Sequence, residues 1–147
     1  MSENPIPVRI APGPAAAPGP EDGRLRVLVV EDVILVRMRI VATLEAEPGL
    51  NVVGAAGTCV EAQALLIGLR PDVLVSDIGL PGTPEIRNGI ELIAWSVRRD
   101  PRLRAIILTN YTDDAYHQAA IRAGAAAFLD KSTEFSKLPD VILSLSR

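Results

Sequence analysis

The sequence predicts a doubly wound α/β fold, in which a five-stranded parallel sheet is covered on both faces by five helices. Strand-like apolar runs alternate with helix-like segments five times from Arg26 onward. The runs are rich in valine, leucine and isoleucine, which is typical of strands buried on both faces of a sheet. Five units are too few to close an eight-stranded barrel, so an open sheet with right-handed crossovers is expected.

Each predicted strand is a short apolar run next to a turn or a helix end. The third run, for example, follows Pro71 and reads Val73-Leu74-Val75 before it reaches Ser76 and Asp77. Such uninterrupted runs favour strands without a solvent-facing side. In chain order the predicted strands are residues 26–30, 51–55, 72–76, 105–108 and 125–129.

Capping and turn residues mark the helices between the strands. Thr58 with Glu61, and Asn88 with Glu91, have the spacing of a capping box and start the second and third helices. Gly124 marks the end of the fourth helix, because glycine tolerates the left-handed conformation there. In chain order the predicted helices are residues 33–47, 58–70, 88–100, 113–124 and 135–146.

Composition excludes several classes of protein. A chain of 147 residues has the length of one domain with a substantial core. Its net charge of −3 and pI near 5.2 give no basic surface for nucleic acid. No apolar stretch has the length of a membrane span and no signal peptide is recognisable, while the single cysteine, Cys59, fits a reducing compartment. We therefore expect a cytoplasmic protein that binds neither nucleic acid nor membrane.

The first 22 residues differ in composition from the rest of the chain. Six prolines alternate there with alanine and glycine, a composition that disfavours both helices and strands. We expect residues 1–22 to form a flexible or polyproline-like tail and residues 23–147 to form the folded domain.

Polar side chains follow four of the five predicted strands. Glu31 and Asp32 follow the first strand, Asp77 the third, Thr109 the fourth and Lys131 the fifth. The carboxyl ends of the strands share one edge in such a sheet, and ligands bind there. Neighbouring carboxylates repel one another unless a cation compensates their charge, and Mg²⁺ prefers oxygen ligands of this kind. The sequence therefore predicts a divalent-cation site with a reactive carboxylate.

These residues resemble the signature of a known family, the receiver domain of two-component response regulators. The resemblance rests on Glu31-Asp32, on Asp77 followed by Gly79-Leu80-Pro81-Gly82, on Thr109 and on Lys131, and it covers residues 25–147. It implies a flavodoxin-like sheet with strand order 2-1-3-4-5. Because the chain ends at Arg147, directly after the last predicted helix, we expect a stand-alone, chemotaxis-regulator-like receiver domain.

The resemblance also implies roles for the acids. Asp77 would be the phosphoacceptor, charged by a phosphohistidine on a histidine kinase or phosphotransfer protein. Asp32 and Asp77 would bind Mg²⁺, with Glu31 assisting through water and the Gly79 carbonyl completing the protein ligands. The protein would be a signalling switch that catalyses only its own phosphorylation and dephosphorylation.

Three further residues receive roles from the same resemblance. Lys131 and the Thr109 hydroxyl would each bind a phosphoryl oxygen. The phosphoryl group would draw Thr109 inward, and Phe128 would rotate into the space that this leaves. The surface of the fourth helix, fifth strand and fifth helix would then bind an unidentified output protein, unless the domain only relays phosphate.

The sequence departs from the family pattern in three places. Ser132 follows Lys131 where the family usually has proline in a cis peptide, so we expect a trans bond and an altered loop. About four extra residues lie within residues 82–88 beside the acceptor, where they would shade the site or dock a partner. Asn110 and Tyr111 follow Thr109, and Tyr111 would overhang the phosphoryl group and slow the attack of water.

Alternative functions are weighed against these departures. An aspartyl phosphohydrolase wants a second aspartate where Gly79 stands, and a dinucleotide or flavin binder needs a glycine-rich turn where Glu31-Asp32 stands. The alternative that Ser132 and the long loop leave open is a receiver-like module that binds partners without being phosphorylated.

The first predicted helix carries more apolar residues than one buried face needs. Val33, Val36, Ile40 and Leu44 form one stripe; Ile34, Met38 and Val41, with Leu35 beside them, form another. Either the last helix or the tail covers the second stripe, or it is a docking face for a helical partner or a homodimer contact.

Overall fold

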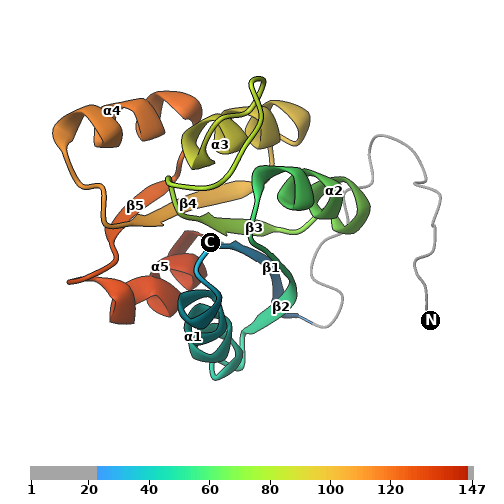
Figure 1. The fold of residues 1–147 in the computed structure, drawn as a ribbon. Helices are drawn as coiled ribbons and strands as arrows, with labels where there is room; N and C mark the ends of the chain where they lie inside the picture. The colour runs from blue at the N-terminus through green and yellow to red at the C-terminus, as the bar shows by residue number, and fades with distance from the viewer. Residues whose placement is uncertain (1–22, 146–147) are drawn as a thin grey trace.

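The computed structural model describes residues 23–145, and the predicted sheet is present within them. Its five parallel strands lie in the order β2-β1-β3-β4-β5 (Figure 1). This order confirms the doubly wound, flavodoxin-like arrangement, with the switch point between β1 and β3. The expectation of a tail over residues 1–22 lies outside the described residues.

All five strands form where the apolar runs predicted them, with ends that differ by one or two residues. The difference is largest at the last strand, which begins at Ala127 rather than at Ala125. The N–H of Ala125 donates to the carbonyl of Ala120 at 3.0 Å, so this residue closes the preceding helix instead. The strands are β1 Leu25–Val30, β2 Leu50–Ala56, β3 Val73–Ser76, β4 Arg104–Thr109 and β5 Ala127–Asp130.

The five helices are also present, and Thr58 and Asn88 cap the second and third helices as predicted. The glutamates of the two boxes accept from the residues before the caps, Gly57 and Arg87. Glu61 N donates to Thr58 Oγ1 at 3.1 Å, and Glu91 N donates to Asn88 Oδ1 at 3.0 Å. The longest helix has 12 residues, and within residues 23–145 no helix is long and apolar enough to cross a membrane. The helices are α1 Ile34–Glu45, α2 Cys59–Leu69, α3 Gly89–Arg99, α4 Asp114–Ala123 and α5 Leu138–Leu145, with a 3₁₀ turn, Phe135–Lys137, before α5.

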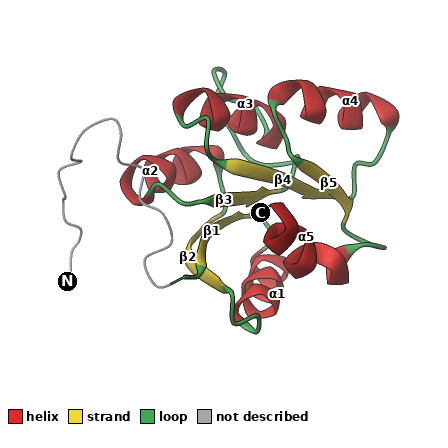
Figure 2. Cartoon of the chain, turned by 180° about the vertical axis from the view of Figure 1, so that it is seen from behind, coloured by secondary structure: helices red, strands yellow, loops and turns green. Residues whose placement is uncertain are grey.

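The helices cover the sheet in two layers. α1 and α5 lie on one face, and α2, α3 and α4 lie on the other (Figures 1 and 2). Successive residues of β1 point to opposite faces: Val27 and Val29 belong to the core beneath α1 and α5, whereas Leu28 and Val30 belong to the core beneath the other three helices. Because both faces are covered, polar side chains of the central strands reach solvent only at the strand ends.

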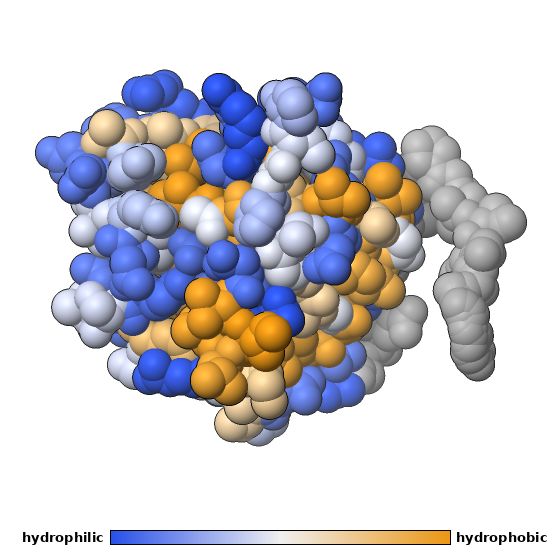
Figure 3. Space-filling model, viewed as in Figure 1, coloured by the Kyte–Doolittle hydropathy of each residue, from blue (hydrophilic) through white to orange (hydrophobic). Residues whose placement is uncertain are grey.

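α1 buries only one of its two apolar stripes. Ile40 and Leu44 are buried in the core, but Ile34, Leu35 and Met38 are 61%, 77% and 61% exposed. Figure 3 shows an apolar patch over α1, the helix that carries these exposed residues. The expectation that the last helix covers this second stripe is therefore wrong for these three residues. Val33, assigned to the buried stripe, is also half-exposed.

Candidate functional site

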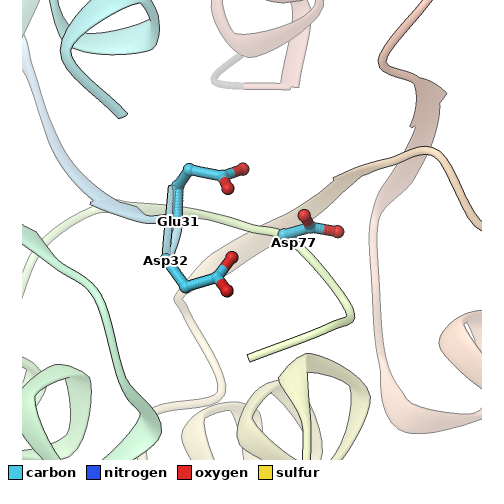
Figure 4. A group of neighbouring side chains, drawn as sticks. All are labelled: Glu31, Asp32 and Asp77. Carbon is cyan, nitrogen blue, oxygen red and sulfur yellow. The ribbon is translucent and has the colours of Figure 1, made fainter. Parts of the chain in front are cut away.

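Three carboxylates meet at the adjacent ends of β1 and β3 (Figure 4). Val30 and Ser76 are paired in the sheet, so the residues that follow them, Glu31 and Asp77, leave the sheet side by side. One oxygen from each of Glu31, Asp32 and Asp77 lies within 4.8 Å of the others. Glu31 and Asp77 are buried, whereas Asp32 is exposed. We call these three residues the acid cluster; the strand-end rule predicted it correctly.

Asp77 is held by the backbone around it. Its N–H donates to the Val30 carbonyl at 3.1 Å, and its Oδ1 accepts from the N–H of Ile78 at 2.6 Å. Gly89, at the start of α3, lies so close that a Cβ there would collide with the Asp77 carbonyl. The backbone of Asp77 is therefore held between the sheet and α3, and the N–H of Ile78 orients its carboxylate.

Lys131 follows β5, an edge strand of the sheet, and its side chain extends to the acid cluster. Its N–H donates to the Thr109 carbonyl at 2.8 Å, and its Nζ lies 2.7 Å from Asp77 Oδ2 and 2.6 Å from Glu31 Oε1. Burial by itself lowers the pKa of Lys131, but the hydrogen bonds and charges of Asp77 and Glu31 outweigh it and raise that pKa above its usual value. Lys131 therefore brings one positive charge to both buried acids.

Glu31 is the most enclosed member of the cluster, with 1% of its surface exposed. Burial raises its pKa, and the hydrogen bonds from Lys131 and from the N–H of Val33 only partly offset this. Arg37 Nη1 also donates to the Glu31 carbonyl at 2.9 Å. Sequence reasoning missed the direct contact with Lys131 and the role of Arg37, because neither has a local sequence signal.

The acid cluster fits a hard divalent cation. All its ligands are carboxylate oxygens, the type that Mg²⁺ prefers, and opposite ligands of one Mg²⁺ lie about 4 Å apart. The observed separations, up to 4.8 Å, approach this spacing. Lys131 supplies one positive charge against three carboxylates, so a cation would compensate charge that the side chains leave unbalanced.

Thr109 and Tyr111 form the β4 side of the site. Thr109 is fully buried, and its Oγ1 accepts from the N–H of Tyr111 at 3.1 Å. The Tyr111 ring lies against Gly79, where a Cβ would come within 2.9 Å of the ring carbon Cε2. Tyr111 itself is 50% exposed. The ring therefore lies next to the loop that follows Asp77, and its predicted shielding of a phosphoryl group stays a prediction.

Phe128 lies on the β5 side, half-buried. Its ring packs against the exposed His117 of α4, with ring centroids 4.8 Å apart. This contact has no local sequence signal, and it connects the predicted switch residue to α4.

The remaining two departures from the family pattern have local explanations. No cis peptide occurs within residues 23–145, so the bond between Lys131 and Ser132 is trans, as expected. Residues 82–88 form a closed loop: Thr83 N donates to the Ile86 carbonyl at 2.9 Å, and Ile86 is buried in the core beneath α2 and α3. The loop also lines a pocket of about 470 Å³ with α2 and α3, including Gln63 and Trp95.

Known proteins share this fold and are similar to this chain in sequence. Residues 27–143 match the model of the response regulator receiver domain. The chain is 42% identical over 114 residues to the DNA-binding transcriptional activator DevR/DosR of Mycobacterium tuberculosis, covering 78% of this chain and 51% of that protein. It is 34% identical over 125 residues to the transcriptional regulatory protein LiaR of Bacillus subtilis, covering 84% and 56%. The chain thus spans about half the length of these relatives.

Solved structures agree with this match. The response regulator domain of Thermotoga maritima CheB superposes with a TM-score of 0.70 at 32% identity, covering 83% of this chain and 92% of that one. A LuxR-family two-component response regulator from Aurantimonas sp. gives 0.76 at 30% identity, covering 83% and 84%. The isolated domain of RcsB from Salmonella enterica serovar Typhimurium, with the phosphomimetic BeF₃⁻, gives 0.77 at 26% identity, covering 84% and 88%.

Proposed function

The chain belongs to the response regulator receiver domain family, and we propose that Asp77 is its phosphoacceptor in a Mg²⁺-dependent reaction. Receiver domains interact with histidine kinases or phosphotransfer proteins, and a phosphohistidine on such a protein is the donor in this proposal. The observation that carries it is the position of Asp77, 2.7 Å from Lys131 and beside two further acids. The protein would work in the cytoplasm as a switch that acts on no substrate but itself.

Asp77 supplies the nucleophile for the transfer. One of its oxygens attacks phosphorus, the P–N bond breaks with its electron pair going to the imidazole nitrogen, and an acyl phosphate forms. The hydrogen bond from Ile78 to Oδ1 orients the side chain before the donor arrives. Lys131 then transfers its contact from the carboxylate to a phosphoryl oxygen, and the Thr109 hydroxyl donates to another.

The acid cluster supplies the metal ligands in this proposal. Asp32 and Asp77 would hold Mg²⁺ directly, with the Gly79 backbone carbonyl, and Glu31 would assist through water. When bound, the ion neutralises charge on the transferring phosphoryl oxygens. The contacts of Glu31 support its outer position, because Lys131 and the N–H of Val33 already occupy its two oxygens.

Output would pass through the surface formed by α4, β5 and α5. Movement of Thr109 toward the phosphoryl group makes room for Phe128, and the His117 ring packed on Phe128 carries the change to α4. Tyr116 and Ile121 expose apolar surface on α4, which supports a separate protein as the partner.

The exposed patch on α1, formed by Ile34, Leu35 and Met38, lies at the same end of the sheet as the acid cluster. In this proposal it is the docking surface for the phosphodonor. Alanine at Ile34 and Met38, both 61% exposed, would slow transfer from the donor protein without changing transfer from acetyl phosphate. A change in oligomeric mass, with no change in transfer, would identify the patch as a homodimer contact instead.

Acetyl phosphate tests the central claim without a partner protein. The protein is incubated with acetyl phosphate and Mg²⁺, and a base-labile mass gain of one phosphoryl group is measured by mass spectrometry. We expect the gain in the wild type, its loss with EDTA, and its absence in Asp77→Asn. Asp140→Asn, which changes an exposed acid of α5, is the matched control and is expected to behave as wild type.

Two outcomes would contradict the proposal. An equal gain in Asp77→Asn would place the acceptor elsewhere. No gain in a folded wild type, whether from acetyl phosphate or from a histidine kinase, would favour the alternative of a receiver-like module that binds partners without phosphorylation.

A further inference from the structure

The segment that follows β5 is closed by reciprocal hydrogen bonds between Asp130 and Glu134. Glu134 N donates to the Asp130 carbonyl at 2.8 Å, and Asp130 N donates to Glu134 Oε1 at 2.9 Å. β5 is an edge strand of the sheet. Within residues 23–145, the N–H and carbonyl of Asp130 therefore have no further strand to bond. We call residues 130–134 the 130–134 turn.

The Asp130 carboxylate also stabilises the 130–134 turn, through hydrogen bonds with Ser132. Its Oδ1 accepts from both the N–H of Ser132, at 2.8 Å, and the Ser132 hydroxyl, at 2.7 Å. These bonds, with further ones from Thr133, hold the pKa of Asp130 below its usual value. Hydrogen bonds to a charged acceptor are the stronger kind, so the carboxylate fixes the backbone on the C-terminal side of Lys131.

Lys131 is thereby held on both sides. Its backbone N–H donates to the Thr109 carbonyl on the neighbouring strand, β4, and the turn fixes the residue after it. A lysine side chain loses rotamer entropy when it is ordered, and a free backbone would add to this cost. With the backbone fixed, the Nζ reaches Glu31 and Asp77 at 2.6 and 2.7 Å.

We propose that Asp130, Ser132 and Glu134 are positioning residues that place the Lys131 ammonium at the acid cluster, in place of the cis proline typical of the family. Ser132 contributes an N–H and a hydroxyl to this arrangement, and proline has neither donor. We therefore expect proline at position 132 to misplace the Lys131 side chain in this chain. The part of the inference that concerns phosphorylation rests on the proposed function.

Nuclear magnetic resonance of the lysine ammonium groups tests the positioning without phosphorylation. The chain contains two lysines, Lys131 and Lys137. Lys137 is 63% exposed and lies 3.7 Å from Glu134 Oε2, so its signal serves as the reference for an exposed ammonium group. In ¹⁵N-lysine-labelled protein we expect a distinct, slowly exchanging signal from Lys131. It should broaden or shift toward that of Lys137 in Asp130→Ala, in Ser132→Ala and in Ser132→Pro.

The phosphorylation rate is measured on the same proteins with acetyl phosphate and Mg²⁺. We expect Asp130→Ala and Ser132→Pro to slow it by about 10- to 100-fold, the range that misplacement of a catalytic group produces. Asp130→Asn and Ser132→Thr retain the acceptor and the donors and should restore both readouts. Asp100→Ala is the matched control, because Asp100 makes the same kind of turn with Arg102 N, at 3.1 Å, before β4.

The outcomes separate this inference from the proposed function. An unchanged Lys131 signal in Asp130→Ala and Ser132→Ala would overturn the inference, as would faster phosphorylation in Ser132→Pro. If the Lys131 signal responds as expected but the wild type takes up no phosphate, the positioning by the turn stands and the proposed function fails.

Discussion

The strand that delivers Asp77 and the strand that precedes Lys131 belong to the same sheet, but the fold buries them and their neighbouring helices to different extents. All four residues of β3, which delivers Asp77, are buried, and α3 behind it buries Gly89, Leu92, Ile93 and Ser96. β5, which precedes Lys131, buries only Leu129, and α4 buries only Ala120. We call the first region, β1, β3 and α3, the acceptor half and the second, β5 and α4, the output half.

This difference separates two requirements of a switch. The nucleophile that we propose, Asp77, needs a fixed geometry, which the buried strands β1 and β4 on either side of β3 provide. A surface that changes with phosphorylation must have a second arrangement within a few kcal/mol, and elements with few buried contacts meet that condition. Lys131 is the exception, because it belongs to the output half by sequence and to the acceptor half by its contacts.

Removal of the Lys131 charge should have the largest effect on the acceptor half. We expect Lys131→Met to slow phosphorylation from acetyl phosphate by about 10²- to 10³-fold, as loss of a charge-stabilising donor does in other active sites. Lys137→Met, which removes an exposed lysine, should leave the rate unchanged. A rate within a fewfold of wild type for Lys131→Met would show that the two halves do not meet through this residue.

The pH dependence of stability gives an independent measure of the same contact. The folded-state pKa of Lys131 is raised, so its contribution to stability is complete below its unfolded value of about 10.5 and is lost as the pH rises through the folded value. We expect the wild type to lose more stability than Lys131→Met above about pH 10.5, as measured by denaturant unfolding. Parallel curves for the two proteins would contradict the assigned contact.

Glycine substitutions test how closely the acceptor half is packed. Gly89→Ala would push a methyl group into the Asp77 carbonyl, and we expect it to destabilise the fold by about 3 kcal/mol. Gly124→Ala, in the output half, places alanine at a φ of 109° and should cost about 1–2 kcal/mol. Gly68→Ala, in α2 with open space around it, should stabilise the fold by about 0.5 kcal/mol.

Denaturant unfolding of these three variants decides whether the halves differ in packing. A cost for Gly89→Ala of less than about 1 kcal/mol would contradict the close packing of the acceptor half, because it would mean that α3 shifts easily away from Asp77.

The sequence predicted the positions of the site residues because a rule about strand ends applies to them directly. Glu31, Asp32 and Asp77 follow strands that the apolar pattern identifies, and parallel strands end at one edge of the sheet. The same rule put Thr109 and Lys131 at that edge. Their meeting follows from fold class alone and requires no knowledge of side-chain conformations.

The contacts among these residues were not predictable in the same way. Lys131 is 100 residues from Glu31 in the chain, and which acids it bonds depends on rotamers and on local packing. Ser132 was read as a loss, the absence of a family proline. Its two hydrogen bonds to Asp130 emerge only when the turn is built, because they depend on the conformation that the missing proline would otherwise set.

The smallest expected effect belongs to Tyr111, at the border between the two halves. Its ring lies against Gly79, in the loop that follows Asp77, yet it is 50% exposed and its other ring contact is Tyr116, at 5.6 Å between centroids. If the ring shields the acyl phosphate from water, Tyr111→Ala should speed the loss of phosphate by roughly threefold, ~0.7 kcal/mol. Tyr116→Ala, which leaves the contact with Gly79 intact, should change the rate less.

The measurement is the decay of phosphorylated protein after acetyl phosphate is removed, followed by mass spectrometry. A rate that is unchanged or slower in Tyr111→Ala would show that the ring does not shield the site. An increase of tenfold or more would contradict the comparison itself, because a half-exposed loop residue would then control the stability of the acyl phosphate as strongly as the buried residues do.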